Sequence, residues 1–154
     1  MHRDSLHLTL AFLGEQSVGR IDVLRSLAEG VRGEPFVLML SCLGSYQRNR
    51  VVWAGPETTP TPLILIVERL GAALRSEGFP VESRPFSAHV TLVRNARQAP
   101  SAMIDPPLRW HVDHFVLMRS RLGSDGARYE EVGRWPLNGP ADGKRASAAG
   151  APGQ

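Results

Sequence analysis

The sequence has few of the features that place a chain in a membrane or an oxidising compartment. It contains a single cysteine, Cys42, so no intrachain disulfide can form, which fits a reducing cytosol. No apolar run approaches the roughly 20 residues that a membrane-spanning helix needs. Asp4 and His7 interrupt the apolar start that a signal segment would require. We therefore expect a cytoplasmic protein with no membrane partner.

Lysine is nearly absent as well. Lys144 is the only lysine, so arginine supplies the rest of the 18 basic residues, and the net charge is +3. Arginine presents planar, bidentate donors that suit phosphate groups, although a genomic bias toward arginine codons explains the same excess. The charge is compatible with a phosphate-bearing partner and does not require one.

The remaining composition predicts one α+β domain. The 154 residues, 42% of them hydrophobic, suffice for a single core. Apolar residues at helical spacing predict a helix capped by Ser17 and a second helix over residues 63–75. Strands are expected at residues 6–13, 36–43, 50–55, 87–94, 110–118 and 128–135. Because the strands do not alternate regularly with helices, α+β is favoured over a doubly wound parallel sheet.

The domain is expected to cover residues 1–138. Residues 139–154 are mostly Gly, Ala, Ser and Pro with few apolar side chains. Such a segment buries too little to offset its ordering entropy, so we expect a disordered tail.

A histidine and a threonine two residues apart occur in two of the expected strands. His7 and Thr9 stand in the run LHLTL, and His89 and Thr91 stand in AHVTL. Side chains two apart in a strand share one face, so each strand has one polar face and one apolar face. If the polar faces meet, two imidazoles and two hydroxyls surround one small volume.

Such a group suits phosphodiester chemistry without a metal. With a reference pKa of about 6.5, histidine supplies both a neutral base and a protonated acid near neutrality. Threonine hydroxyls can donate to phosphate oxygens as charge develops on them. One His-x-Thr alone is better explained by structure, because threonine favours strands; the repeat in a similar context favours catalysis.

At these two motifs the sequence resembles the 2H phosphoesterases, and within them the bacterial RNA 2′,3′-cyclic phosphodiesterases, also called 2′-5′ RNA ligases. Four stretches carry the resemblance: LHLTLAFLGE at 6–15, RVVWAG at 50–55, RPFSAHVTLVRNA at 84–96 and RYEEVGRWPL at 128–137. The resemblance implies two pseudo-symmetric lobes of antiparallel sheets and flanking helices around a central cleft.

The resemblance also implies an activity. It is hydrolysis of RNA 2′,3′-cyclic phosphate ends to 2′-phosphomonoesters, with reversible 2′-5′ joining of RNA ends and with no metal or other cofactor. His7 would protonate the leaving 3′-oxygen, His89 would activate water, and Thr9 and Thr91 would hold the phosphate oxygens. RNA ends and small 2′,3′-cyclic or 2′-5′-linked nucleotides would be the partners.

Two further residues are implied in substrate binding. Arg94 follows His89 by five residues and would bind the phosphate, while Phe12 follows His7 by five residues and would stack on the terminal base. Strict strand alternation puts both on the wrong face, so a bulge or strand end must re-aim them. Core packing is the preferred role for Phe12.

One departure from the family pattern concerns the start of the chain. Family members place a strand and a helix before the first motif, whereas six residues precede His7. We expect a shortened N-terminus that could leave a sheet edge open. A monomer is expected, with a dimer through that edge as the alternative. The alternative function is an RNA-end-binding module without turnover.

Other polar residues are given structural interpretations. His111 and His114 would point to opposite faces of one strand, so surface roles are favoured over a metal site. Arg48 and Arg50, near Tyr46, could touch an RNA backbone, but a solvated loop is preferred.

Overall fold

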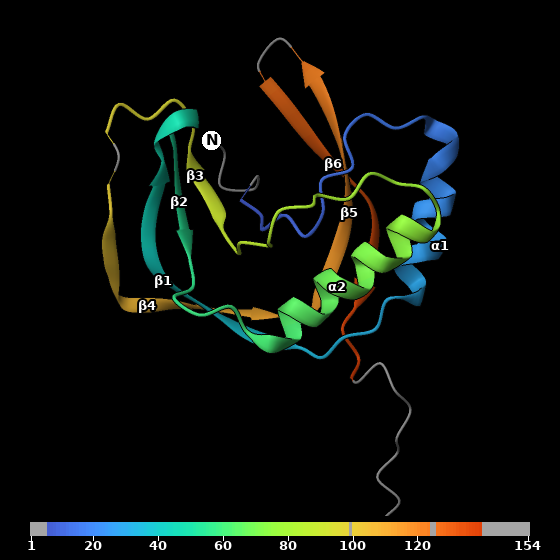
Figure 1. Cartoon of the computed structure of the whole chain (residues 1–154), viewed down its shortest axis with the longest axis horizontal. Coiled ribbons are helices and arrows are strands. Elements are labelled where there is room, and N and C mark those ends of the chain that lie inside the picture. The colour runs from blue at the N-terminus through green and yellow to red at the C-terminus, as the bar shows by residue number, and fades with distance from the viewer. Residues whose placement is uncertain (1–5, 99, 124–125, 140–154) are drawn as a thin grey trace, which may run out of the picture.

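The computed structural model describes residues 6–98, 100–123 and 126–139. An antiparallel sheet in the order β3-β2-β1-β4 forms one lobe, and the β5–β6 hairpin with helix α1 forms the other (Figure 1). The strands are β1 (Phe36–Tyr46), β2 (Val51–Gly55), β3 (Val90–Val93), β4 (Ala102–Val112), β5 (His114–Gly123) and β6 (Gly126–Pro136). The helices are α1 (Ile21–Gly30) and α2 (Thr61–Ser76), with short 3-10 turns η2 (Val18–Arg20) and η3 (Gln47–Asn49).

Helix α2 joins the two lobes. It begins with a proline in its first turn, where a missing N–H leaves no hydrogen bond unmade. Its buried face carries Leu63, Ile66 and Leu74, each 2% exposed. Leu63 packs in a cluster with Leu38 of β1, whereas Ile66 packs in one with Phe115 of β5. The same helix face therefore fixes the sheet and the hairpin relative to each other.

Most expected elements are present, but two strands were wrongly placed. Residues 6–13 do not form a strand; Leu8 makes only an isolated antiparallel bridge, to Val90, and the chain bends at Leu10. The expected strand at 110–118 is two strands, β4 and β5, separated at Asp113. The first part of β4 was not predicted as a strand because it contains Pro106, which cannot donate a backbone hydrogen bond. β4 is an edge strand, where proline is tolerated.

Smaller differences concern caps and ends. Helix α2 extends the expected 63–75 segment by two residues at its start and one at its end. Ser17 precedes η2 and makes no side-chain capping bond. None of the described helices is both long enough and apolar enough to cross a membrane. Apart from Gly139, the expected tail lies outside the described residues.

Ion pairs lie both between and within the strands of the β5–β6 hairpin. Arg119 of β5 donates to Glu130 of β6 at 2.6 Å, and Arg134 donates to Glu131 within β6 at 2.6 Å. The Arg119 hydrogen bond lowers the pKa of Glu130 below the ordinary 4.5, and the Arg134 hydrogen bond does the same for Glu131. All four side chains are at least 31% exposed, so each pair contributes modestly.

Acid is expected to weaken this hairpin. A carboxylate whose pKa is lower in the folded state stabilises that state above its unfolded pKa. The contribution is lost as the pH falls through the folded pKa, so the protection factors of amides in β5 and β6, which correct for the intrinsic pH dependence of exchange, should fall below about pH 4.5. In a Glu130→Gln/Glu131→Gln variant this fall in the protection factors should be smaller. An identical acid response in the variant would contradict the assignment.

Candidate active site

The two His-x-Thr motifs meet at the Leu8–Val90 bridge. Residues opposite each other in an antiparallel pair project to the same face. Because Leu8 lies opposite Val90, His7 lies beside Thr91, and Thr9 beside His89. Leu8 packs against the core and Val90 is 5% exposed, so these two define the apolar face. The four polar side chains therefore share the other face, related by a local twofold axis through the bridge.

A hydrogen bond to a backbone carbonyl determines which ring nitrogen of His89 carries the hydrogen. Its Nδ1 lies 2.8 Å from the carbonyl oxygen of Ser87. A carbonyl only accepts hydrogen bonds, so Nδ1 carries the hydrogen, and the neutral ring has its lone pair on Nε2. His89 can thus accept a proton at Nε2 while Nδ1 stays anchored.

Aromatic rings flank both histidines. Tyr129 of β6 lies 5.1 Å from the His7 ring, and Tyr46, at the end of β1, lies 5.4 Å from the His89 ring (centroid distances). The ring of Trp53 in β2 lies close to both rings of the second pair, 5.7 Å from Tyr46 and 6.5 Å from His89. A Cβ at Gly44 would collide with the Trp53 ring, so glycine there makes room for the tryptophan.

A bulge re-aims Arg94. Trp53 pairs with Thr91, but the adjacent Val52 pairs with Val93, so β3 has one extra residue at this point. A bulge shifts the alternation of side chains by one. Val93 therefore takes the face of Val52, and Arg94 leaves the strand on the side of Thr91. Arg94 is exposed there.

A bend re-aims Phe12. Leu8 and Leu10 pack against the core, but beyond the bend it is Ala11 and Leu13 that do so. The apolar alternation thus changes phase at Leu10, and Phe12 is left 76% exposed. The preferred expectation of core packing for Phe12 is wrong, because the first motif segment is bent rather than a continuous strand.

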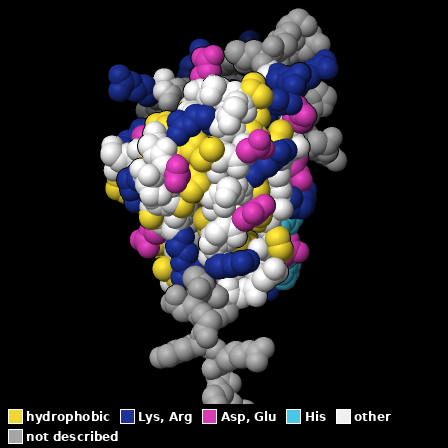
Figure 2. Space-filling view, turned by 90° about the vertical axis from the view of Figure 1, so that its right-hand side faces the viewer, with side chains coloured by type: hydrophobic (Ala, Val, Ile, Leu, Met, Phe, Trp, Pro, Cys, Tyr) yellow, Lys and Arg dark blue, Asp and Glu magenta, His cyan; other side chains and the backbone are white. Residues whose placement is uncertain are grey.

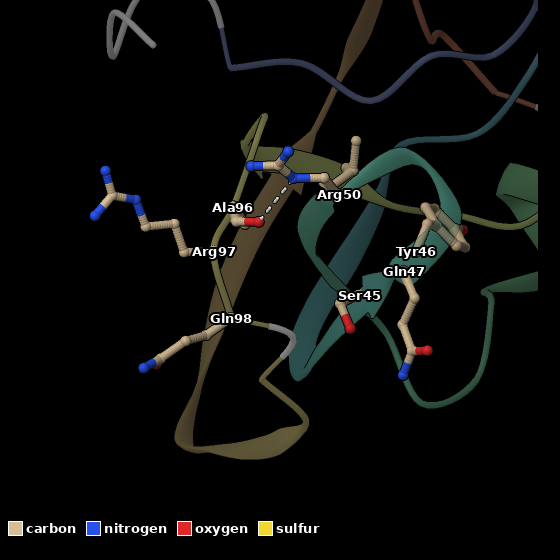
Figure 3. A pocket seen from close by; sticks show the side chains of 8 residues that line it. Ser45, Tyr46, Gln47, Arg50, Ala96, Arg97 and Gln98 are labelled. Atoms are coloured by element: carbon tan, nitrogen blue, oxygen red, sulfur yellow. Dashed lines mark hydrogen bonds between the residues drawn. The ribbon is translucent and has the colours of Figure 1, made fainter.

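A cavity of about 350 Å³ lies at the end of the β1–β2 hairpin. Figure 3 shows Arg97 and Gln98 on one side of it and Ser45 and Gln47 on the other, with the Tyr46 ring pointing away. Its full lining is Ser45, Tyr46, Gln47, Arg50, Val51, Ala96, Arg97 and Gln98. Two arginines and no carboxylate line this cavity. One of its lining residues, Tyr46, also contacts the His89 ring.

The α1 side of the molecule has a different character. Figure 2 shows arginine and acidic side chains interspersed there among apolar ones. Mixed charge of this kind gives no focused field for a polyanion.

The remaining histidines stand apart from the motifs. His111 lies in β4 and His114 in β5, so the expectation that they share one strand is wrong. His114 contacts Asp113 through Nδ1 and accepts from Arg134 at 2.6 Å through Nε2. Within the described part of the chain, no three His, Cys, Asp or Glu side chains cluster as metal ligands would.

Sequence reasoning identified the two motifs but missed their aromatic neighbours. Tyr129 lies in one of the stretches that resemble the family, yet nothing in RYEEVGRWPL indicates contact with His7. Tyr46 was noted only beside two loop arginines. Both contacts depend on how the two lobes pack against each other, which the local sequence does not show.

Comparisons with known proteins cover both motifs. A family model described as the 2′-5′ RNA ligase superfamily matches residues 1–124. An RNA 2′,3′-cyclic phosphodiesterase of Escherichia coli (strain K12) is 39% identical over 137 residues, which cover 87% of this chain and 77% of the relative. One of Geobacillus stearothermophilus is 30% identical over 162 residues, covering 97% of this chain and 51% of the relative.

Solved structures agree with the fold. The crystal structure of E. coli LigT complexed with 3′-AMP matches with a TM-score of 0.78 at 36% identity, covering 88% of this chain and 79% of that chain. The match confirms the predicted α+β fold of antiparallel sheets with few helices.

Proposed function

Because the chain belongs to the 2′-5′ RNA ligase superfamily, we propose that it hydrolyses RNA 2′,3′-cyclic phosphate ends to 2′-phosphomonoesters. The observation that supports this proposal is the antiparallel bridge between Leu8 and Val90, because strand alternation on either side of it predicts that two imidazoles and two hydroxyls share one face. Relatives named RNA 2′,3′-cyclic phosphodiesterase support the same reaction.

In the proposed reaction the two histidines act as base and acid. His89 takes a proton from water at Nε2, and the water oxygen forms a bond to phosphorus. The bond from phosphorus to the 3′-oxygen breaks, and His7 donates a proton to that oxygen. The product carries a 2′-phosphate and a 3′-hydroxyl. Positioned acid or base catalysis contributes about 10²–10⁴-fold to such a step.

The remaining residues hold the phosphate and the terminal nucleotide. Thr9 and Thr91 flank the histidines and donate to the non-bridging oxygens, where charge gathers as phosphorus becomes five-coordinate. Arg94, which leaves β3 on this side, supplies a positive charge for the same oxygens. Phe12, exposed beyond the bend at Leu10, offers an apolar ring for the terminal base. RNA ends and small cyclic or 2′-5′-linked nucleotides present the same phosphate to these groups.

The direct test is incubation with an RNA that carries a 2′,3′-cyclic phosphate end, in the presence of EDTA. The expected product is the 2′-phosphomonoester, formed at a steady rate. The same RNA with a 3′-hydroxyl end is the matched control and should stay unchanged. A 3′-phosphomonoester, or binding of the cyclic end without any product, would contradict the proposal.

A further inference from the structure

Two half-exposed tyrosines, one from each lobe, contact the rings of the two histidines. Tyr129 contacts His7 at 5.1 Å with its ring tilted by 59°, and Tyr46 meets His89 at 5.4 Å nearly edge-on, at 85°. Tyr46 is 38% exposed and Tyr129 39% exposed. Each end of the histidine pair thus has an accessible aromatic ring beside it.

We propose that these tyrosines are two separate nucleoside-binding positions, one for each of the two RNA ends that a single phosphorus connects. The inference rests on the proposed function and extends it from one nucleoside to two. Nucleic-acid bases stack on aromatic side chains, and each such contact is worth roughly five- to a hundredfold in binding. Stacking of this kind tolerates any base, because every base has a π face.

The direction of the reaction assigns each tyrosine to one end. In hydrolysis the nucleophile enters beside His89 and the 3′-oxygen leaves beside His7. The nucleoside that carries the cyclic phosphate therefore keeps its ribose near His7, where Tyr129 lies. A second RNA end brings its 5′-hydroxyl to the place of the water, so its nucleoside lies near His89, where Tyr46 lies.

The same two positions serve the cleavage of a 2′-5′ linkage. The 3′-hydroxyl gives its proton to His7 and attacks phosphorus, and the bond from phosphorus to the 5′-oxygen breaks. His89 protonates the departing 5′-oxygen. The products are a 2′,3′-cyclic phosphate and a free 5′-hydroxyl, and no further reactant is needed. Joining is the reverse of these steps.

Two arginines line the cavity that Tyr46 borders, on the side that this assignment gives to the second RNA end. Tyr46 borders the cavity lined by Arg50 and Arg97. The Arg50 side chain donates to the carbonyl oxygens of Ala96 and Asn95, and no carboxylate of the described residues pairs with either arginine.

In the β5–β6 hairpin that carries Tyr129, Arg119 is paired with Glu130 and Arg134 with Glu131. Water alone as nucleophile needs no cationic surface on its side. A second polyanionic strand does, and Arg50 and Arg97 line the cavity on the side where it would enter.

The test compares two substrates in each variant, a nucleoside 2′,3′-cyclic phosphate and a 2′-5′-linked dinucleoside monophosphate. The readout is the ratio of kcat/KM for the dinucleotide to kcat/KM for the mononucleotide. Tyr46→Ala should lower this ratio by roughly five- to a hundredfold, whereas Tyr129→Ala should lower both constants and leave the ratio near the wild-type value. Tyr46→Phe keeps the π face and should keep the ratio.

The outcomes separate this inference from the proposed function. If the wild type hydrolyses the mononucleotide but never cleaves the dinucleotide, or if Tyr46→Ala leaves the ratio unchanged, the inference is overturned and the hydrolase stands. If the wild type does not hydrolyse the mononucleotide, the proposed function itself fails. A cooperative thermal melt reports folding of each variant independently of activity. Tyr46→Leu, which keeps apolar contact with Trp53, replaces the alanine variant should that one not fold.

Discussion

Alanine in place of either His7 or His89 is expected to lower kcat/KM for a 2′,3′-cyclic phosphate end by about 10²–10⁴-fold. Each histidine performs a different proton transfer in the same transition state, so the remaining ring cannot take over the missing one. The bridge between Leu8 and Val90 places both rings on one face, and the loss should therefore be similar for the two variants. The measurement is steady-state hydrolysis in EDTA.

The double variant and a control histidine sharpen this prediction. Groups that act as a unit are strongly non-additive, so His7→Ala/His89→Ala should be little slower than either single variant. His111 lies exposed in β4, and His111→Ala should retain wild-type activity. Full turnover in either motif variant would show that these imidazoles do not transfer the protons.

Removing a threonine hydroxyl should produce the next largest effect. A hydrogen bond to a charged group contributes about 1.5–3 kcal/mol, so Thr9→Val or Thr91→Val should reduce the rate roughly ten- to a hundredfold. Valine keeps the branched shape that suits an extended segment, and Thr9 is exposed while Thr91 is half-buried. The fold should therefore survive both changes.

The division between kcat and KM identifies what the hydroxyls hold. If they bind the charge that appears only in the transition state, kcat falls more than KM rises. Thr9→Ser and Thr91→Ser keep the hydroxyl and should recover most of the lost rate. Serine variants as slow as the valine variants would point to packing rather than hydrogen bonding.

The α+β class could be predicted because it depends on local patterns. The apolar spacing of residues 63–75 is periodic, and α2 lies where that spacing indicated. Residues 6–13 were harder, because an apolar run indicates burial and not pairing. Leu8, Leu10, Ala11 and Leu13 are all directed to the core, yet only Leu8 has a bridge partner among the described strands.

The candidate site divides in the same way. The spelling His-x-Thr predicted which side chains share a face, because strand alternation is a local rule. The bulge that turns Arg94 is visible only in the register of β2 against β3. The contacts of Tyr129 with His7 and of Tyr46 with His89 join residues far apart in the chain. They follow from lobe packing, which no local pattern encodes.

The pH dependence of kcat/KM, measured in EDTA on a 2′,3′-cyclic phosphate end, tests most directly whether one imidazole must be neutral while the other is protonated. We predict a bell-shaped profile for the wild-type protein, because activity requires a base and an acid at once. Loss of all activity on adding EDTA, or a rate that does not change with pH, would contradict catalysis by the His7–His89 pair.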